Sequence, residues 1–434
     1  MFLRSRIVLL SALCAIALLT KTDPGSAHEY SRFGTVESLV DRGTFRLDDS
    51  SFIGTIDKIY RDGHYYSHQP PLLPVLEAPV YWAINLPGIR FNNRGRFVMT
   101  YLFILMTNGL ALALTIVVMA KILERGGVAA QGRDLLAALL TFGTWLLPYG
   151  IVSNNHGVSA LLVAALIWQL LASEGKPVTR VTAASIGLIL GLLVAIELLP
   201  LVSFAPLTLV YLAWRRLDAR SWGALAVGMA VPLGAHALLN VRITGDVIPA
   251  GFHHELFDYP GSVFDPSTLT GTIKYDSIQG VAHYAWTAMV SENGFLVFAP
   301  LLLAALAAGA VSWRWWARMR GVQLVVLGSI ALSLGAAILT TNNYGGEAVG
   351  FRHAVYLAPA FLTLLLPWLD DGPHRRPRGR VVVETVAAMS VFLMLVFAVR
   401  QPWSVLTLER APIGTWDQYL PIVAKIVRGD LFNP

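Results

Sequence analysis

The sequence predicts an all-α polytopic membrane protein with about eleven transmembrane helices and a long first outer loop that contains membrane-surface helices. Hydrophobic residues make up 55% of the 434 residues, and charged residues only 14%. The mean hydropathy is +0.58, and several apolar runs approach the ~20 residues that a helix needs to cross a bilayer. We therefore expect residues 1–434 to form a single membrane domain. The sequence has no P-loop and no dinucleotide-binding fingerprint, which argues against an ATP-driven pump.

A short basic start precedes the first apolar run, residues 7–20. This run has two interpretations. It can be a signal peptide that is cleaved near Ser26 and Ala27, or a first helix that is retained. We favour the retained helix because the chain is polytopic throughout. In both cases the basic start stays in the cytoplasm and Glu29 emerges on the outer side.

Residues 21–96 are expected to form the first outer loop. Inside it, Leu72–Gly88 is apolar enough to resemble a span, but it carries three prolines and Glu77. We therefore expect a helix that lies at the membrane surface rather than a crossing. A second large outer loop is expected at 241–293, and an outer C-terminal tail at 400–434.

The apolar run at 182–214 is too long for one crossing, because it would form a helix of ~50 Å and the hydrocarbon core is only ~30 Å thick. We split it at Glu197–Pro200 into two short crossings. The other spans expected after the first are 97–120, 134–153, 157–172, 222–240, 294–312, 321–340, 353–369 and 381–399.

The distribution of basic residues supports this topology, with the N-terminus inside and the C-terminus outside. The expected inner loops carry fifteen basic residues: Lys121, Arg125, Arg133, Lys176, Arg180, Arg215, Arg216, Arg220, Arg314, Arg318, Arg320, Arg375, Arg376, Arg378 and Arg380. The outer loops between residue 121 and the tail carry three: Arg242, Lys274 and Arg352. The net charge of +6 therefore reflects orientation and contact with anionic lipid, and not nucleic-acid binding.

The first outer loop offers candidate catalytic residues. Glu29 follows the end of the first helix, where a carboxylate can act as a general base on an acceptor hydroxyl. Arg32 would share a helix face with Glu29 and can bind phosphate through two N–H groups. The alternative is a surface ion pair in the first turn of a loop helix. The single cysteine, Cys14, excludes an intrachain disulfide.

Other polar residues have plain structural interpretations beside functional ones. Asp48 and Asp49 with the following serine are typical of a turn or a helix cap. Tyr65 and Tyr66 can stack on a sugar or belong to the interfacial aromatic belt. The sequence His253-His254-Glu255 lacks the spacing of a zinc-binding helix.

Two further groups lie at expected helix mouths. His156 follows Asn154 and Asn155, and it can line a pocket or simply satisfy a helix end. Glu197 is the acid that lies deepest in the apolar part of the chain, and such residues are functional candidates by default. Gly187 and Gly191 form a G-x-x-x-G pattern, which indicates close helix packing.

Several motifs resemble one family of membrane enzymes. They are H-E-Y-S-R, T-V-E-S-L-V-D-R-G-T, D-D-S and D-G-H-Y-Y-S-H-Q-P-P-L-L in the first loop, G-T-W-L-L-P-Y with S-N-N-H at 143–156, and N-Y-G-G-E-A-V-G-F-R-H at 343–353. In this order they resemble the GT-C superfamily of integral-membrane glycosyltransferases. The branch they resemble is the bacterial family 39-like group related to protein mannosyltransferases and aminoarabinose transferases.

The resemblance implies an inverting glycosyltransferase of the bacterial cytoplasmic membrane, with its catalytic loops outside. The donor would be a sugar linked to polyprenyl phosphate, and the acceptor an envelope glycan, lipid or protein. Glu29 matches the catalytic base. The residues expected to bind substrate are Arg32, Lys58, His64, Tyr65, Tyr66, His68, Asn155, His156 and Arg352. Relatives commonly carry lysine where this chain has Gln69. No motif supports a metal site or a divalent cation.

Two alternatives remain open at this point. The chain can be a catalytically lapsed relative that binds a lipid-linked glycan or scaffolds an envelope complex, with Gln69 as the motivating feature. It can also be a transporter or flippase, which predicts buried charges at mid-membrane and broken helices in paired halves. Only Glu197 fits that second description, and the sequence has no paired halves.

Overall fold

The computed structural model describes residues 2–264, 275, 277–290, 294–341, 348, 350–372, 376–400 and 402. The tail expected beyond residue 402 lies outside the described residues, as do parts of the expected second loop and the first part of the 343–353 motif.

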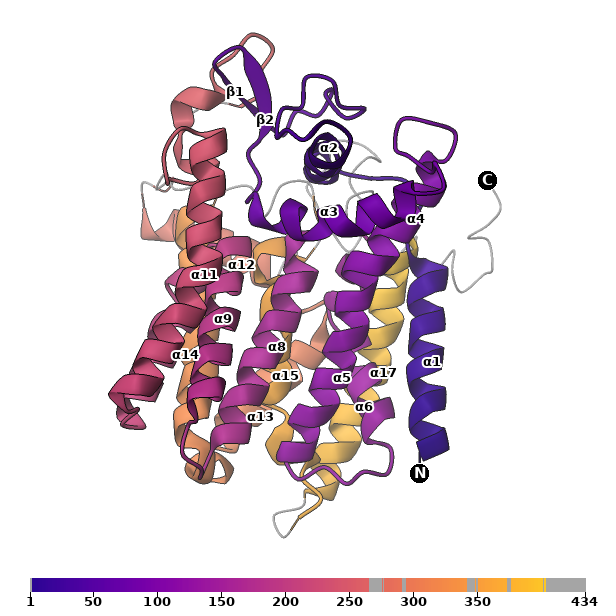
Figure 1. Cartoon of the computed structure of the whole chain (residues 1–434). Coiled ribbons are helices and arrows are strands. Elements are labelled where there is room, and N and C mark those ends of the chain that lie inside the picture. The colour runs from indigo at the N-terminus through magenta and orange to yellow at the C-terminus, as the bar shows by residue number, and fades with distance from the viewer. Residues whose placement is uncertain are drawn as a thin grey trace.

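Long helices lie side by side in one bundle, and the first loop covers one end of it (Figure 1). We call this end the loop end; it carries α2, the β1–β2 hairpin and α3, whereas the N-terminus of α1 lies at the opposite end (Figure 1). The α-helices are α1 Phe2–Leu19, α2 Ala27–Arg42, α3 Leu72–Asn85, α4 Arg96–Ile104, α5 Leu110–Arg125, α6 Arg133–Phe142, α7 Leu146–Gly150, α8 Asn155–Ser173, α9 Arg180–Ile196, α10 Phe204–Trp214, α11 Ala219–Ile243, α12 Ile278–Met289, α13 Pro300–Val311, α14 Arg320–Thr340, α15 Ala358–Thr363, α16 Leu366–Leu369 and α17 Pro377–Arg400. The short turns are η1 Leu105–Gly109, a π-helix, and the 3-10 helices η2 Leu199–Leu201, η3 Ala250–Phe252, η4 His254–Phe257, η6 Trp315–Met319 and η7 Arg352–Leu357.

The helix lengths confirm a polytopic membrane protein. Among the described residues, five helices are long and apolar enough to cross a bilayer: Arg96–Arg125, Asn155–Ser173, Ala219–Ile243, Arg320–Thr340 and Pro377–Val399. Four shorter apolar helices accompany them: Arg6–Leu19, Arg180–Ile196, Leu199–Trp214 and Pro300–Val311. The total of about eleven spans stays a prediction.

Two expected spans are broken rather than continuous. The span expected at 134–153 divides into α6 and α7 at Gly143. A Cβ on Gly143 would lie 3.3 Å from the carbonyl oxygen of Ala387 in α17, so close helix packing accompanies the break. The span expected at 353–369 divides into η7, α15 and α16, with Pro359 and Pro367 in the first turns of the two helices. By contrast, the expected division of 182–214 is confirmed, since α9 ends at Ile196 and α10 begins at Phe204.

The G-x-x-x-G pattern of α9 packs against α11, as its sequence indicates. A Cβ on Gly187 would lie 2.1 Å from the carbonyl oxygen of Leu225, and a Cβ on Gly228 would lie 2.2 Å from that of Ala184. These distances leave no room for a side chain, so the two backbones touch directly.

The loop end is held down by a cluster of aromatic side chains beneath α2. Phe33 of α2 stacks on Phe91 at 4.9 Å between ring centroids and meets Phe103 edge-on at 5.4 Å. Phe52 and Tyr81 extend the cluster. The predicted surface helix is α3, which lies across the end of the bundle beside α2 (Figure 1). Each such ring pair contributes about 0.5–1.5 kcal/mol beyond the burial of its surface.

A hairpin completes this end. Strands β1, Lys58–Arg61, and β2, His64–Ser67, pair antiparallel around Asp62 and Gly63. Both turn residues have positive φ, 50° and 84°, which matches the twist of a two-residue hairpin turn.

Candidate active site

Glu29 lies in the first turn of α2 and is fully buried. Ser26 caps the helix and accepts the backbone N–H of Glu29 at 3.3 Å. The Glu29 Oε2 atom accepts the backbone N–H of Gly25 at 2.7 Å and the Ser26 hydroxyl at 3.4 Å. Its Oε1 atom accepts the backbone N–H of Ser153 at 2.9 Å. Burial raises the pKa of Glu29 to about 7, against the opposing effect of these hydrogen bonds.

Arg32 lies one turn further along α2 and is 1% exposed. Its Nη2 atom donates to Asn155 Oδ1 at 3.4 Å. Its Nε and Nη1 atoms are buried and have no hydrogen-bond partner within the described part of the chain. Four carboxylates, those of Glu77, Glu29, Glu197 and Asp57, attract this guanidinium electrostatically. A buried cation with two unpaired donor atoms is expected to bind an anionic ligand.

Glu77 of α3 is the buried acid that attracts Arg32 most. Neither of its oxygens has a hydrogen-bond partner among the described residues. Burial raises the pKa of Glu77 to about 7, and the nearby Arg32 lowers it by a smaller amount. The surface helix therefore contributes a buried acid to the site, which its role as a membrane-surface element did not predict.

A second group, which we call the His–Asp cluster, contains His28, Asp57, His68 and Gln69. His28 Nδ1 lies 2.5 Å from Asp57 Oδ2, and His68 Nδ1 lies 3.3 Å from Asp57 Oδ1. Gln69 Nε2 lies 3.0 Å from Asp57 Oδ2. Burial lowers the pKa of His28 to about 4, and the nearby histidines hold the pKa of Asp57 below its usual range although burial opposes them.

Hydroxyl groups hold the His–Asp cluster together. Ser31 of α2 donates to the backbone oxygen of Asp57 at 2.6 Å, and its oxygen lies 2.6 Å from the hydroxyl of Ser67. Ser67 in turn accepts the backbone N–H of Gln69 at 3.1 Å. Thr55 donates to the backbone oxygen of Ala27 at 2.9 Å. These bonds bring the start of the hairpin and its exit beside the first turn of α2.

The start of α8 forms the wall opposite α2. Asn155 Nδ2 donates to Glu197 Oε2 at 2.8 Å, and His156 Nδ1 lies 2.8 Å from the same oxygen. Arg352, in the first turn of η7, interacts electrostatically with Asp57 and Glu197 and repels Arg32. The structure thus brings residues expected to bind substrate, Arg32, His68, Asn155, His156 and Arg352, to one place with Glu29.

Four other expected residues lie apart, on the hairpin. Lys58 Nζ donates to the backbone oxygen of Ile53 at 2.6 Å and lies 4.6 Å from the ring centre of Tyr65. His64 Nδ1 lies 3.2 Å from Asp48 Oδ2, so Asp48 anchors the hairpin as the turn interpretation expects. Tyr66 packs beside a small apolar cluster around Ile59. The hairpin side chains are therefore engaged in contacts within the loop end.

The described residues contain one group that has the geometry of a metal site. The ligand atoms of His28, Asp57 and His68 all lie within 4.8 Å of one another. His253, which the sequence also raised, instead lies between Asp246 at 3.1 Å and Glu255 at 2.9 Å on an exposed turn.

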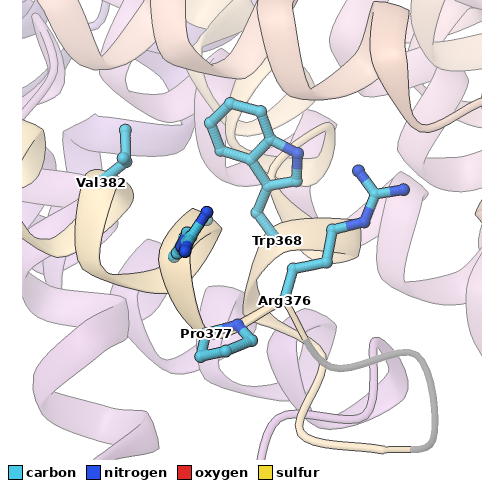
Figure 2. Close-up of a pocket in the computed structure, with 6 residues that line it drawn as sticks. Trp368, Arg376, Pro377 and Val382 are labelled. Carbon is cyan, nitrogen blue, oxygen red and sulfur yellow. The ribbon is translucent and has the colours of Figure 1, made fainter.

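Figure 2 shows a surface pocket with a cavity volume of about 500 Å³, and none of the acids described above lines it. It is formed by the end of α16 and the beginning of α17, and it is lined by Trp368, Arg376, Pro377, Arg378, Gly379 and Val382. Its lining contains no acid, so it offers no general base, and we place the chemistry at the loop end.

Sequence reasoning missed three members of the site: His28, Glu77, and Asp57 as a buried acid. His28 precedes the expected base directly, and Asp57 precedes the expected Lys58, so their presence in the motifs was the available signal. Only the fold shows that they converge.

The fold and the site describe a polytopic membrane protein with buried acids, histidines and arginines gathered at one end of its bundle. The chain belongs to glycosyltransferase family 87, whose model matches residues 93–341. Comparison with curated protein sequences found no match.

Two solved structures share the fold. Oligosaccharyltransferase AglB from Archaeoglobus fulgidus, in complex with an inhibitory peptide and a dolichol-phosphate, aligns with a TM-score of 0.52 and 13% identity over 98% of this chain and 58% of that chain. ArnT from Cupriavidus metallidurans, bound to undecaprenyl phosphate, aligns with a TM-score of 0.52 and 14% identity over 97% of this chain and 69% of that one. The chain thus spans little more than half the length of the archaeal protein. The expected GT-C fold is confirmed.

Proposed function

We propose that this protein transfers a sugar from a polyprenyl-phosphate carrier to a hydroxyl group of an envelope acceptor, at the loop end of the bundle. The observation that carries the proposal is Arg32, whose buried Nε and Nη1 atoms have no partner among the described residues. A phosphate group presents paired oxygens that match two N–H groups of a guanidinium. Arg352, which interacts with the same acids, supplies a second positive charge.

A lipid carrier suits this position. The candidate site is built on α2, α3 and the start of α8, where the first loop meets the ends of apolar helices (Figure 1). A phosphate at the membrane surface can reach this site while the hydrocarbon chain of the carrier stays in the lipid. The neighbours bound to dolichol-phosphate and undecaprenyl phosphate support a donor of the same class.

Glu29 is the proposed general base. A carboxylate has about four lone-pair positions, and three donors occupy three of them. One position on Oε1 therefore remains for the acceptor hydroxyl. Because Glu29 is fully buried, the acceptor reaches it only after residues around it move.

The reaction proceeds with inversion. The acceptor oxygen attacks the anomeric carbon while its proton passes to Glu29. The bond between that carbon and the phosphate oxygen breaks, and the electron pair leaves with the phosphate. Arg32 and Arg352 stabilise the charge that develops on this leaving group.

The proposed orientation places the loop end on the outer face of the cytoplasmic membrane. The expected basic inner loops support it. Three of these connections contact one another at the end away from the first loop: the backbone N–H of Asp371 donates to Gly127 at 3.2 Å, and the indole of Trp315 donates to Asp370 at 2.8 Å.

The experiment is a transfer assay with the full chain in proteoliposomes that contain a radiolabelled polyprenyl-phospho-sugar and envelope extract. Wild-type protein should release polyprenyl phosphate and label the extract. Arg32→Ala should abolish this release, whereas Arg90→Ala, an exposed arginine outside the cluster, should keep it. Movement of the intact lipid-linked sugar across the bilayer without release would instead establish the transporter alternative.

A further inference from the structure

The His–Asp cluster brings several atoms that carry lone pairs within a few ångströms of one another. Gln69 Nε2 lies 2.5 Å from His28 Nδ1, 3.0 Å from Asp57 Oδ2 and 3.2 Å from His68 Nε2. His28 Nδ1 also lies 2.5 Å from Asp57 Oδ2. Four side chains therefore meet through the same few atoms.

The hydrogen bonds of the cluster depend on which ring nitrogens carry a proton and on how the Gln69 amide is turned. If His28 Nδ1 carries the proton, it can donate to Asp57, and the two amide N–H groups of Gln69 can be directed to Asp57 Oδ2 and His68 Nε2. If Nδ1 has no proton, its lone pair faces the carboxylate of Asp57 at 2.5 Å. If the amide of Gln69 is rotated, its oxygen faces the same carboxylate instead. The ligand atoms of His28, Asp57 and His68 lie within 4.8 Å of one another, so a cation placed among them could accept a lone pair from all three.

His68 supplies an independent observation. Its Nδ1 atom is buried and makes no hydrogen bond within the described residues, although Asp57 Oδ1 lies 3.3 Å away. The contact has the distance of an ion pair without the direction of a hydrogen bond. A ring nitrogen in this state is free to direct its lone pair at a metal.

The formal charges point the same way. Glu29, Asp57, Glu77 and Glu197 are the carboxylates that act on Arg32, and Arg352 is the second guanidinium of the site. A lipid-linked phosphate adds negative charge to a site that already holds these four acids, and a divalent cation offsets part of it.

We propose that His28, Asp57 and His68 bind one divalent transition-metal ion. Two imidazoles and one carboxylate form the donor set of many zinc sites, in which a fourth position stays open. Resting on the proposed function, we assign that open position to a phosphate oxygen of the lipid-linked donor, which Arg352 would contact from the other side. The motif search did not predict this site, because its ligands come from α2, the start of β1 and the exit of β2.

Metal binding is measured first, without any donor. The purified full chain is stripped with a chelator and dialysed, then titrated with Zn²⁺ by calorimetry and analysed for metal by mass spectrometry. We expect one Zn²⁺ per chain. Co²⁺ added to the stripped protein should give the visible absorption of a low-symmetry site, and Zn²⁺ should then displace it, which tests the wild-type protein without a substitution. A chain that holds no metal after dialysis against micromolar Zn²⁺ would overturn the proposal.

Variants then locate the ion. His68→Ala and Asp57→Asn should each weaken Zn²⁺ binding by about a hundredfold or more, since loss of a ligand costs at least as much as loss of a supporting residue. His253→Ala is the matched control, because His253 likewise contacts acidic side chains, Asp246 at 3.1 Å and Glu255 at 2.9 Å, but lies outside the cluster. Equal loss of zinc in the control would place the ion elsewhere and overturn the assignment.

Gln69→Lys separates this inference from the proposed function. Its ammonium would lie among His28, Asp57 and His68 and replace the charge of the ion. We expect the variant to lose Zn²⁺ and to bind polyprenyl phosphate in the presence of chelator, whereas the stripped wild-type protein should bind that lipid at least tenfold more weakly than the zinc-loaded protein. Equal lipid binding by stripped and loaded wild type would overturn the bridging role, and the proposed transfer would stand.

Discussion

The backbone N–H of Ser153 donates to the Glu29 carboxylate over 2.9 Å. This bond joins the first turn of α2 to the residues that lead into α8, so two segments that are distant in the sequence meet at the site. The next residue, Asn154, caps α8, because its side chain accepts the N–H of Gly157 at 2.9 Å.

Arg32→Lys should weaken binding of polyprenyl phosphate by about ten- to a hundredfold. A lysine keeps the charge but cannot offer two parallel N–H groups to one phosphate. The measurement is a lipid-binding titration in nanodiscs. Arg90→Lys serves as the control, because Arg90 is exposed and its Nε donates only to Asn85. Unchanged affinity in Arg32→Lys would show that the guanidinium does not hold the phosphate.

The sequence predicted the architecture well, because membrane helices are apolar runs of defined length. The division at Glu197, the surface helix at 72–88 and the packing of Gly187 all followed from local patterns. The breaks at Gly143 and in the 353–369 segment did not, because they depend on contacts with other helices. There the expected continuous spans were wrong.

Glu77→Gln should flatten the dependence of stability on pH. The pKa of Glu77 is raised from 4.5 to about 7 in the folded state, so the folded chain holds a proton that the unfolded chain releases. Its contribution is fully present below pH 4.5 and is lost as the pH rises through 7. The glutamine stays neutral, so the variant should gain up to about 3 kcal/mol relative to wild type from pH 5 to pH 8.

The measurement for Glu77 is the free energy of unfolding in detergent at several pH values. Glu124→Gln is the control, since the side chain of Glu124 is 59% exposed in the last turn of α5. This substitution should leave the slope of unfolding free energy against pH unchanged. Parallel curves of unfolding free energy against pH for wild type and Glu77→Gln would refute the raised pKa of Glu77.

Phe33→Ala should destabilise the folded protein by about 3–5 kcal/mol, because it removes the ring that Phe52, Phe91 and Phe103 all contact. The same substitution should lower activity further, since α2 carries Glu29 and Arg32. Thermal unfolding measures the first effect. Phe97→Ala is the control, because Phe97 is 59% exposed and should change the stability by about 0.5 kcal/mol or less.

The candidate site was harder to predict than the fold. Glu29 and Arg32 could be found because they follow the first helix directly. His28, Asp57 and His68 meet only because Ser31 and Ser67 fasten the hairpin to α2. Lys58 carries the charge expected of a phosphate ligand, but its ammonium donates to Ile53 within the loop. Residue type alone therefore identified the chemistry of the loop and misjudged which side chains share one space.

Glu29→Gln tests the central claim most directly. The glutamine is nearly the same size, so the bond from Ser153 can persist, but an amide cannot take the acceptor proton. Release of polyprenyl phosphate from a labelled polyprenyl-phospho-sugar should fall by about 10²- to 10⁴-fold, while binding of polyprenyl phosphate stays within about twofold of wild type. Release at the wild-type rate would contradict the assignment of Glu29 as the base.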